Sequence, residues 1–229
     1  MVEVEGLWKR WGRKTALRGV TARFPAGTVT GILGENGSGK STLFRIVAGV
    51  TRSSQGRATV DGVPVSRQTR RVTAFLPEVD PYYGWMRVDE QLAYLSAFYP
   101  GWDAAKEKDL LAFMKLDPRA RIGELSHGQR ARLKLVAAFA WPSRLVVMDE
   151  PFNGIDPPSR LRILDTLVRE LRVEEQTVLL STHLVAEVEE MVEHVVYLRD
   201  GVVALEGHAD DLRRDRGGSL STIFEEVAS

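Results

Sequence analysis

The feature that most constrains this chain is a glycine-rich loop between an apolar run and a helical pattern. The loop reads Gly34-Glu35-Asn36-Gly37-Ser38-Gly39-Lys40-Ser41-Thr42. It follows a β-like run at residues 28–33 and precedes a helical pattern at residues 43–48. A strand, a loop of the form G-x-x-x-x-G-K-[ST] and a helix, in this order, predict a phosphate-binding site.

The chemistry of this loop depends on its glycines and on its basic and hydroxyl side chains. Glycine lets backbone N–H groups turn toward phosphate oxygens without a Cβ clash, and the following helix directs its positive end there. Lys40 reaches the β- and γ-phosphates, and Ser41 is placed to ligate Mg²⁺. The predicted nucleotide-binding residues of the loop are Gly34, Asn36, Gly37, Ser38, Gly39, Lys40, Ser41 and Thr42. The alternative is a glycine-rich turn that matches by chance.

An acidic pair after a second apolar run supplies the other half of such a site. Residues 145–148 are Leu-Val-Val-Met, which is typical of a strand buried on both faces, and Asp149 and Glu150 follow. Loops of this class use an aspartate at the end of a buried strand to hold Mg²⁺. We therefore assign Asp149 to the metal and Glu150 to general-base catalysis on an attacking water. Taken alone, the pair is also typical of a solvated loop.

Size and charge are those of an ordinary globular chain. Its 229 residues suffice for one large domain, or for a domain with a subdomain. Lysine plus arginine (31) equals aspartate plus glutamate (31), which argues against a nucleic-acid partner. There is no cysteine, so disulfides and thiolate metal sites are excluded. No apolar stretch is long enough to span a membrane, and the N-terminus lacks a signal-peptide core.

Apolar patterns and turn residues predict alternating strands and helices. We expect strands at residues 2–7, 16–24, 28–33, 57–60, 72–76, 145–148, 178–180, 195–198 and 202–205. Asp200-Gly201 between the last two strands predicts a hairpin. Helical spacing dominates residues 88–141, and further helices are expected at 157–171, at 184–194 and in an amphipathic tail containing Phe224. Buried strands that alternate with helices imply an α/β fold.

A short motif upstream of the acidic pair carries a resemblance to a known family. Leu125-Ser126-His127-Gly128-Gln129 resembles the signature sequence of the ATP-binding cassette (ABC) family at four of its five places. No other class of phosphate-loop protein carries this element. Asn153-Gly154-Ile155-Asp156 resembles the D-loop, and Ser181-Thr182-His183 resembles the switch-histidine loop. Trp11 occupies the place of the aromatic residue that stacks on adenine.

The resemblance implies an architecture and a division of the chain. The implied fold class is α/β, a P-loop NTPase (RecA-like) core with a mainly parallel sheet, an N-terminal antiparallel β-subdomain and an inserted α-helical subdomain. Residues 1–78 and 142–210 would form the core with its β-subdomain, 79–141 the helical subdomain and 211–229 a tail helix. The whole is expected to be a single nucleotide-binding domain.

The resemblance also implies roles for individual residues. Lys40 would hold the β- and γ-phosphates, His183 would sense the γ-phosphate, and Trp11 would offer its ring to adenine. In this family two cassettes enclose two nucleotides head to tail, so turnover would require a dimer, expected to be a homodimer. Ser126 and Gly128 would then reach the partner's γ-phosphate, and Gln129 is assigned with them to nucleotide binding.

The sequence departs from the family pattern at two places. Glu78 stands where a glutamine is usual, and we assign it to the Mg²⁺ site with Ser41 and Asp149. His127 stands where a glycine is usual, and a solvated residue at the helix entry is the favoured interpretation. Glu78 and the tail at 217–227 resemble a subgroup of the family that drives exporters.

An aromatic segment after Glu78 suggests a partner. Residues 79–86 contain Tyr82, Tyr83 and Trp85, which exceeds what a solvated connection needs. In the family this region lines a groove that receives a cytoplasmic helix of a transmembrane permease subunit. Packing of these rings in the seam between subdomains is the equal alternative.

The sequence therefore predicts an ATPase subunit of an ABC transporter that binds ATP and Mg²⁺. Closure of the dimer on ATP would power transport, expected to be export, through a separate transmembrane subunit. The expected location is cytoplasmic, on the inner face of the cell membrane. The alternatives are a soluble ABC ATPase not coupled to transport, a small-molecule kinase and a degenerate nucleotide-binding module. The kinase would need neither signature nor switch histidine, and intact Lys40, Asp149, Glu150 and His183 argue against degeneracy.

Overall fold

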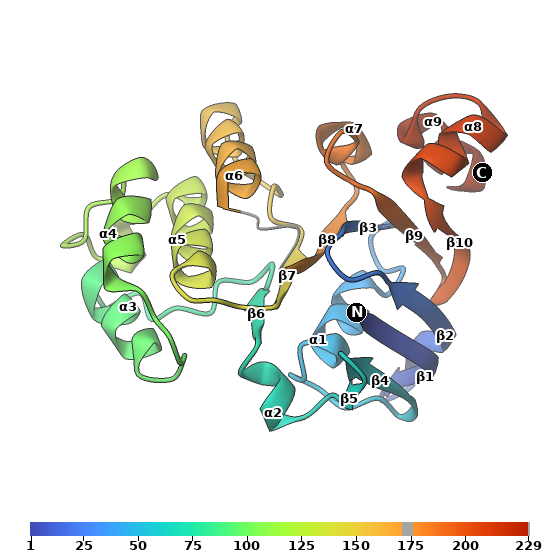
Figure 1. The fold of residues 1–229 in the computed structure, drawn as a ribbon, viewed down its shortest axis with the longest axis horizontal. Coiled ribbons are helices and arrows are strands. Elements are labelled where there is room, and N and C mark those ends of the chain that lie inside the picture. The colour runs from blue at the N-terminus through green and yellow to red at the C-terminus, as the bar shows by residue number, and fades with distance from the viewer. Residues whose placement is uncertain (171–175, 229) are drawn as a thin grey trace. The chain divides into compact units, whose positions relative to one another are not determined.

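The fold is seen in a computed structural model that describes residues 1–170 and 176–228. Its contacts divide the chain into two compact units. The first unit contains Met1–Phe75, Arg144–Glu150 and Arg172–Ser229, and the second contains Leu76–Ser143 and Pro151–Leu171. Strands dominate the first unit and helices the second (Figure 1). The division into core, helical subdomain and tail that the sequence predicts has other bounds than these units and stays a prediction.

An antiparallel sheet is formed by the N-terminal part of the first unit. Its strand order is β2-β1-β4-β5. Alternating burial along the first strand places Val2 and Val4 on the core face, and Leu7 is buried as well because the pairing register shifts between Val4 and Leu7. The strands are β1 (Val2–Trp11), β2 (Lys14–Phe24), β4 (Gln55–Val60) and β5 (Val63–Pro64). The predicted strands at 2–7, 16–24 and 57–60 are confirmed, each in a longer form.

A six-stranded sheet carries the rest of the first unit. Its order is β10-β9-β3-β8-β7-β6, with β3 paired in parallel to both β8 and β9, and β7 paired in parallel to β8. Every residue of β3, β7 and β8 is buried, which confirms the strands predicted from continuous apolar runs. The strands are β3 (Val29–Leu33), β6 (Thr73–Leu76), β7 (Leu145–Asp149), β8 (Thr177–Thr182), β9 (His194–Arg199) and β10 (Val202–His208).

One helix joins the two sheets into a common core. Helix α1 (Lys40–Val47) directly follows the glycine-rich loop, and a second, short helix of this unit is α2 (Arg67–Arg70). Leu43, Phe44 and Val47 are fully buried in one cluster with apolar residues of both sheets. Burial of apolar surface stabilises the protein by about 25 cal/mol per Å². The packing of these side chains therefore holds α1 against the sheets, with its first turn next to the end of β3.

The second unit is helical, and its helices begin at recognisable caps. Asp103 accepts hydrogen bonds from two first-turn amides, and Ser126 and Gln129 form a reciprocal capping box. Its helices are α3 (Val88–Ser96), α4 (Ala104–Phe113), η1 (Ile122–Glu124), α5 (His127–Phe139) and α6 (Pro157–Glu170). They confirm the helical character predicted for residues 88–141 and for most of 157–171, of which the last residue lies outside the described residues.

The helix predicted at residues 184–194 is wrong over most of its length. Only α7 (Val185–Val188) is helical, and β9 begins at His194. The Glu193 N–H donates to the Val29 carbonyl at 2.9 Å, and β9 then continues in parallel pairing with β3. These long-range hydrogen bonds satisfy a backbone whose composition alone favours a helix.

The hairpin and the tail follow the sequence more closely. Strands β9 and β10 pair antiparallel around Asp200 and Gly201, both with positive φ (50° and 80°), as a type I′ turn requires. Where the sequence predicts one tail helix, the structure has α8 (Ala209–Arg216) and α9 (Leu220–Ala228). Within the described residues, no helix is both long and apolar enough to cross a membrane.

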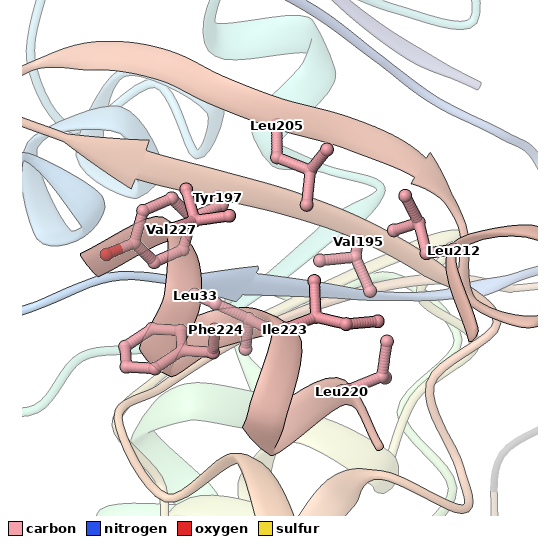
Figure 2. Close-up of a pocket in the computed structure, with 9 residues that line it drawn as sticks. All are labelled: Leu33, Val195, Tyr197, Leu205, Leu212, Leu220, Ile223, Phe224 and Val227. Carbon is pink, nitrogen blue, oxygen red and sulfur yellow. The ribbon is translucent and has the colours of Figure 1, made fainter. Parts of the chain in front are cut away.

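Helix α9 covers an apolar hollow on the six-stranded sheet. Figure 2 shows side chains of α9 and of the strands pointing toward the same space. The Tyr197 and Phe224 rings meet edge to face, with centroids 4.9 Å apart. This arrangement confirms the predicted amphipathic helix. The lining residues are Leu33, Val195, Tyr197, Leu205, Leu212, Leu220, Ile223, Phe224 and Val227.

We expect Phe224→Ala to lower the free energy of unfolding by about 2 kcal/mol, measured by urea denaturation. A fully buried phenylalanine loses roughly 3–5 kcal/mol on truncation, and Phe224 is only partly buried. The control is Glu225→Ala on the exposed side of the same helix, expected to change stability by no more than about 0.5 kcal/mol. Equal effects of the two variants would contradict the packing role.

Candidate functional site

The glycine-rich loop adopts a backbone that only glycine tolerates at key positions. Gly34 and Gly39 have φ of 150° and 112°. A Cβ added at Gly34 would lie 2.4 Å from the Leu198 carbonyl oxygen, and one at Gly39 would lie 2.8 Å from that of Ala16. Gly39 is the N-cap of α1 and gives no side-chain cap, so the first-turn amides are left for an anion.

The remaining loop residues divide between the surface and the interior. Asn36 and Gly37 are exposed, whereas Ser38 is buried. The Ser38 hydroxyl oxygen is buried with no hydrogen-bond partner among the described residues. A buried hydroxyl of this kind in a turn of amides suits phosphate oxygens, and the cradle therefore fits the group that the sequence predicts.

Lys40 places a buried ammonium against three oxygen atoms. Its Nζ donates to the carbonyls of Gly34 (2.7 Å) and Glu35 (3.1 Å), and lies 3.3 Å from Glu150 Oε1. The side chains of Lys40 and Glu150 are only 5% and 6% exposed. A charge so deeply buried needs such partners, and it acts strongly on any anion brought to the loop.

Asp149 and Ser41 meet at the end of β7. The Ser41 hydroxyl donates to Asp149 Oδ1 at 3.1 Å, and the Ser181 hydroxyl donates to the same oxygen at 2.9 Å. A hydroxyl and a carboxylate side by side form a hard oxygen donor set that suits Mg²⁺. No group of three or more His, Cys, Asp or Glu side chains able to hold a metal occurs among the described residues. A cation here would therefore also draw on phosphate and water oxygens, as Mg²⁺ commonly does.

Glu150 lies between a lysine and a histidine. Its Oε2 is 2.9 Å from His183 Nδ1, and its Oε1 faces the Lys40 ammonium. The residue has φ 47°, a left-handed conformation that is uncommon outside glycine. The Ser181 hydroxyl accepts from the Glu150 N–H at 2.9 Å and so supports this conformation. The structure thus brings together the three predicted catalytic residues.

Ser181 is a site residue that the sequence reasoning did not assign. Its hydroxyl accepts from Glu150 N–H and donates to Asp149 Oδ1, so one atom orients both acidic residues. The available signal is position: Ser181 is the penultimate residue of β8, and Asp149 lies opposite Ser181 in the parallel register of β7 and β8. This position becomes visible only once β7 and β8, which are distant in sequence, are known to pair.

The predicted adenine platform lies at the end of β1. Trp11 is 45% exposed, and Trp8 is 39% exposed. Trp8 packs closely over Gly19, where an added Cβ would lie 3.3 Å from the indole nitrogen. Both rings therefore keep free surface, and Trp11 stays the candidate for base stacking.

In the second unit, the signature-like residues form the N-terminus of α5. The Ser126 hydroxyl accepts from Gln129 N–H (3.2 Å), and Gln129 Oε1 accepts from Ser126 N–H (2.8 Å). Gly128 is buried so tightly that a Cβ would lie 2.8 Å from Asp156 Oδ1. His127 is exposed, in line with the solvated residue expected there.

The Asp156 carboxylate is itself well ordered by hydrogen bonds. The backbone N–H and then the side chain of Ser159 lower the pKa of Asp156 below its usual value. Asp156 therefore stays ionised beside Gly128 at neutral pH. The close approach of Gly128 and Asp156 brings the signature-like residues into contact with the D-loop-like residues.

Glu78, an exposed residue of the second unit, is hydrogen-bonded to the D-loop-like segment. Its Oε1 accepts from Asn153 Nδ2 at 3.0 Å, and the Lys134 Nζ donates to the carbonyls of Pro77 (2.7 Å) and Glu78 (3.3 Å). Ser41 and Asp149 belong to the first unit and Glu78 to the second. Its assignment to Mg²⁺ stays a prediction.

The aromatic segment after Glu78 exposes large apolar surface. Val79, Tyr83 and Trp85 are 70%, 52% and 71% exposed. The Tyr83 and Trp85 rings lie 5.8 Å apart. Exposed apolar side chains gathered in this way are typical of a protein-binding surface.

Comparisons with known proteins show which family the chain resembles. Residues 17–153 match the family model described as ABC transporter. The chain is 34% identical over 220 residues to the Nod factor export ATP-binding protein I of Rhizobium etli, covering 92% of this chain and 69% of that protein. It is 30% identical over 237 residues to the linearmycin resistance ATP-binding protein LnrL of Bacillus subtilis, covering 100% and 75%.

A solved structure gives the same result for the fold. The structure titled as the ATP-binding subunit of an ABC transporter superposes with a TM-score of 0.89 at 27% identity. The match covers 100% of both chains. The predicted P-loop NTPase fold, with its antiparallel N-terminal sheet and mainly parallel central sheet, is therefore confirmed.

We expect Ser181→Ala to destabilise the protein by about 2 kcal/mol, measured by urea denaturation. The change removes one donor from Asp149 and leaves the Glu150 N–H without its acceptor, and a buried unsatisfied group costs roughly 1–3 kcal/mol. Ser53→Ala, in the turn before β4, is the control and should stay within about 0.5 kcal/mol of the parent. A Ser181→Ala protein as stable as that control would contradict the bridging role.

Proposed function

The chain belongs to the ABC transporter family, and on that premise we propose that it is the ATP-hydrolysing subunit of an export system. ATP binding and hydrolysis are the activity of such subunits. The observation that carries the site assignment is the meeting of the Lys40 ammonium, the Glu150 carboxylate and the His183 imidazole, with separations of 3.3 and 2.9 Å.

The proposed reaction is attack of water on the γ-phosphate of ATP. The water oxygen bonds to phosphorus, the bond to the β-phosphate oxygen breaks, and ADP leaves. Glu150 accepts the water proton, and Lys40 with the first-turn amides of α1 offsets charge on the phosphates. His183 contacts Glu150 through Nδ1, which leaves its Nε2 for the γ-phosphate.

A magnesium ion is part of this proposal. Ser41 and Asp149 would hold it, and Glu78 stays assigned to the Mg²⁺ site from the sequence alone. When bound, the ion neutralises charge on the β- and γ-phosphate oxygens. Ser181 would keep Asp149 oriented, in the manner of an outer-shell partner at a metal site.

Turnover is proposed to need two copies of the chain. Ser126 stands at the N-terminus of α5, where its hydroxyl oxygen accepts from Gln129 N–H and, among the described residues, its hydrogen is left to donate. In a head-to-tail dimer this hydroxyl and the amide of Gly128 would meet the γ-phosphate held by the partner's loop. In this structure, Gln129 contributes by capping the helix.

The proposed partner is a transmembrane permease subunit. The exposed Val79, Tyr83 and Trp85 offer it an apolar contact surface on the second unit. Such a partner would place this chain in the cytoplasm at the inner face of the cell membrane. A relative at 34% identity is named as an export ATP-binding protein, which supports export over import, as do Glu78 and the tail. An ABC ATPase that is not coupled to transport would not explain why these apolar side chains are exposed.

We expect Glu150→Gln to bind ATP and to hydrolyse it about 10²–10⁴ times more slowly, because it removes the general base. The measurement is steady-state release of phosphate together with ATP binding by equilibrium dialysis. Glu35→Gln removes a charge from an exposed residue of the same loop and should stay within about twofold of the parent. Hydrolysis by Glu150→Gln within about threefold of the parent would remove Glu150 from the base role.

We expect a photo-cross-linking residue at position 83 to form an adduct with the membrane subunit expressed from the neighbouring reading frame. Tyr83 is 52% exposed and lies in the aromatic segment. The control places the same group at Lys108, an exposed residue of α4. No adduct from position 83, with and without ATP, would count against this surface as the permease contact.

A further inference from the structure

The Trp11 ring has a cation against it. The Lys9 ammonium lies 4.3 Å from the centre of the Trp11 ring. A cation within about 6 Å of an indole face is attracted by the negative charge of that face. Trp11 is also 45% exposed, so the ring keeps open surface besides the part that meets Lys9.

Lys9 is itself held in place, which is unusual for a lysine near a surface. Its Nζ donates to Thr51 Oγ1 at 3.1 Å and to the Arg52 carbonyl at 2.6 Å. An ammonium has three N–H donors. Two of them are used by these oxygens, which leaves the third for the indole face. The flexible side chain is thereby fixed at both the loop and the ring.

The loop that holds Lys9 is anchored to the phosphate-binding helix. Thr51 N–H donates to the Arg45 carbonyl at 3.0 Å, and Val50 N–H donates to the same oxygen at 2.8 Å. Arg45 lies in the last turn of α1, whose first residue is Lys40. A helix of this length is a rigid rod of about 12 Å. Lys9 therefore connects the Trp11 ring to the far end of the helix that starts at the phosphate cradle.

We infer that Lys9 is a positioning residue for the adenine base of ATP. It fixes the Trp11 indole at a set distance from the phosphate loop, so that the base stacks on the open surface of the ring while the triphosphate reaches Lys40. This inference rests on the proposed function, in which Trp11 stacks on adenine. Lys9 acts on the base through Trp11 and does not contact the phosphates.

The test compares two ligands that share phosphates and differ in the base. Dissociation constants are measured for ATP and for inorganic tripolyphosphate, each with Mg²⁺. Lys9→Met keeps the aliphatic stem and removes the charge, and should weaken ATP about three- to fivefold, the range expected for an exposed cation–π contact. Tripolyphosphate, which has no base, should bind unchanged. Lys9→Arg, whose guanidinium also stacks on indole, should restore most of the ATP affinity.

A matched control separates positioning from general charge. Lys14→Met removes the same charge from the same hairpin, where Lys14 pairs with Trp11 across the strands. It should leave ATP affinity unchanged. An equal loss in Lys14→Met, or a loss of tripolyphosphate binding in Lys9→Met, would overturn the inference, because the lysines would then act by attracting phosphate.

A double-mutant cycle with Trp11→Ala distinguishes the inference from the function on which it rests. Lys9→Met should have no further effect in the Trp11→Ala background. A full effect there would overturn the inference, because Lys9 would act on ATP without the ring. Unchanged ATP affinity in Trp11→Ala would remove base stacking itself. Loss in Trp11→Ala but not in Lys9→Met would overturn only the role of Lys9.

Discussion

The buried contact between the Lys40 ammonium and the Glu150 carboxylate is the interaction on which the site depends. Two charges with side chains 5% and 6% exposed add little net stability, because desolvation offsets their attraction. Removing either partner would leave an isolated charge in the interior. The surrounding structure therefore supplies further partners: carbonyls of the glycine-rich loop for Lys40, and His183 for Glu150. The pair is better explained by phosphate chemistry than by stability.

The parallel sheet makes this contact possible. Strands β3, β7 and β8 are neighbours in the sheet. The site residues lie at or just beyond the carboxyl ends of these strands: the glycine-rich loop after β3, Asp149 and Glu150 at the end of β7, and Ser181 near the end of β8. Ligands in open α/β sheets bind at this edge. Ser181 exploits the arrangement most directly, since one hydroxyl orients Asp149 and supports the left-handed backbone of Glu150. The second unit contributes another kind of order, in which a capping box and a tightly packed Gly128 fix the start of α5.

Most elements could be predicted from the sequence because their patterns are local. Continuous apolar runs identified β3, β7 and β8, and the spacing of Leu220, Ile223 and Phe224 identified α9. The helix predicted at 184–194 stops after Val188, because Glu193 hydrogen-bonds to Val29 and β9 begins beside β3 at His194, a long-range pairing that no local propensity encodes. The contacts of Ser181 and of Lys9 were not predicted for the same reason: each joins residues far apart in the chain.

The sequence by itself determined the family, the phosphate-loop fold and the chemical types at the site. Those follow from residue identity at fixed spacing: glycines where φ is positive, a lysine after them, and two carboxylates after a buried strand. Only the tertiary structure decided which atoms meet. It aimed His183 Nδ1 at Glu150, set Asn153 against Glu78 and placed the Lys9 ammonium over the Trp11 ring. Distances of a few ångströms between side chains are set by packing and strand register, which the order of residues along the chain does not display.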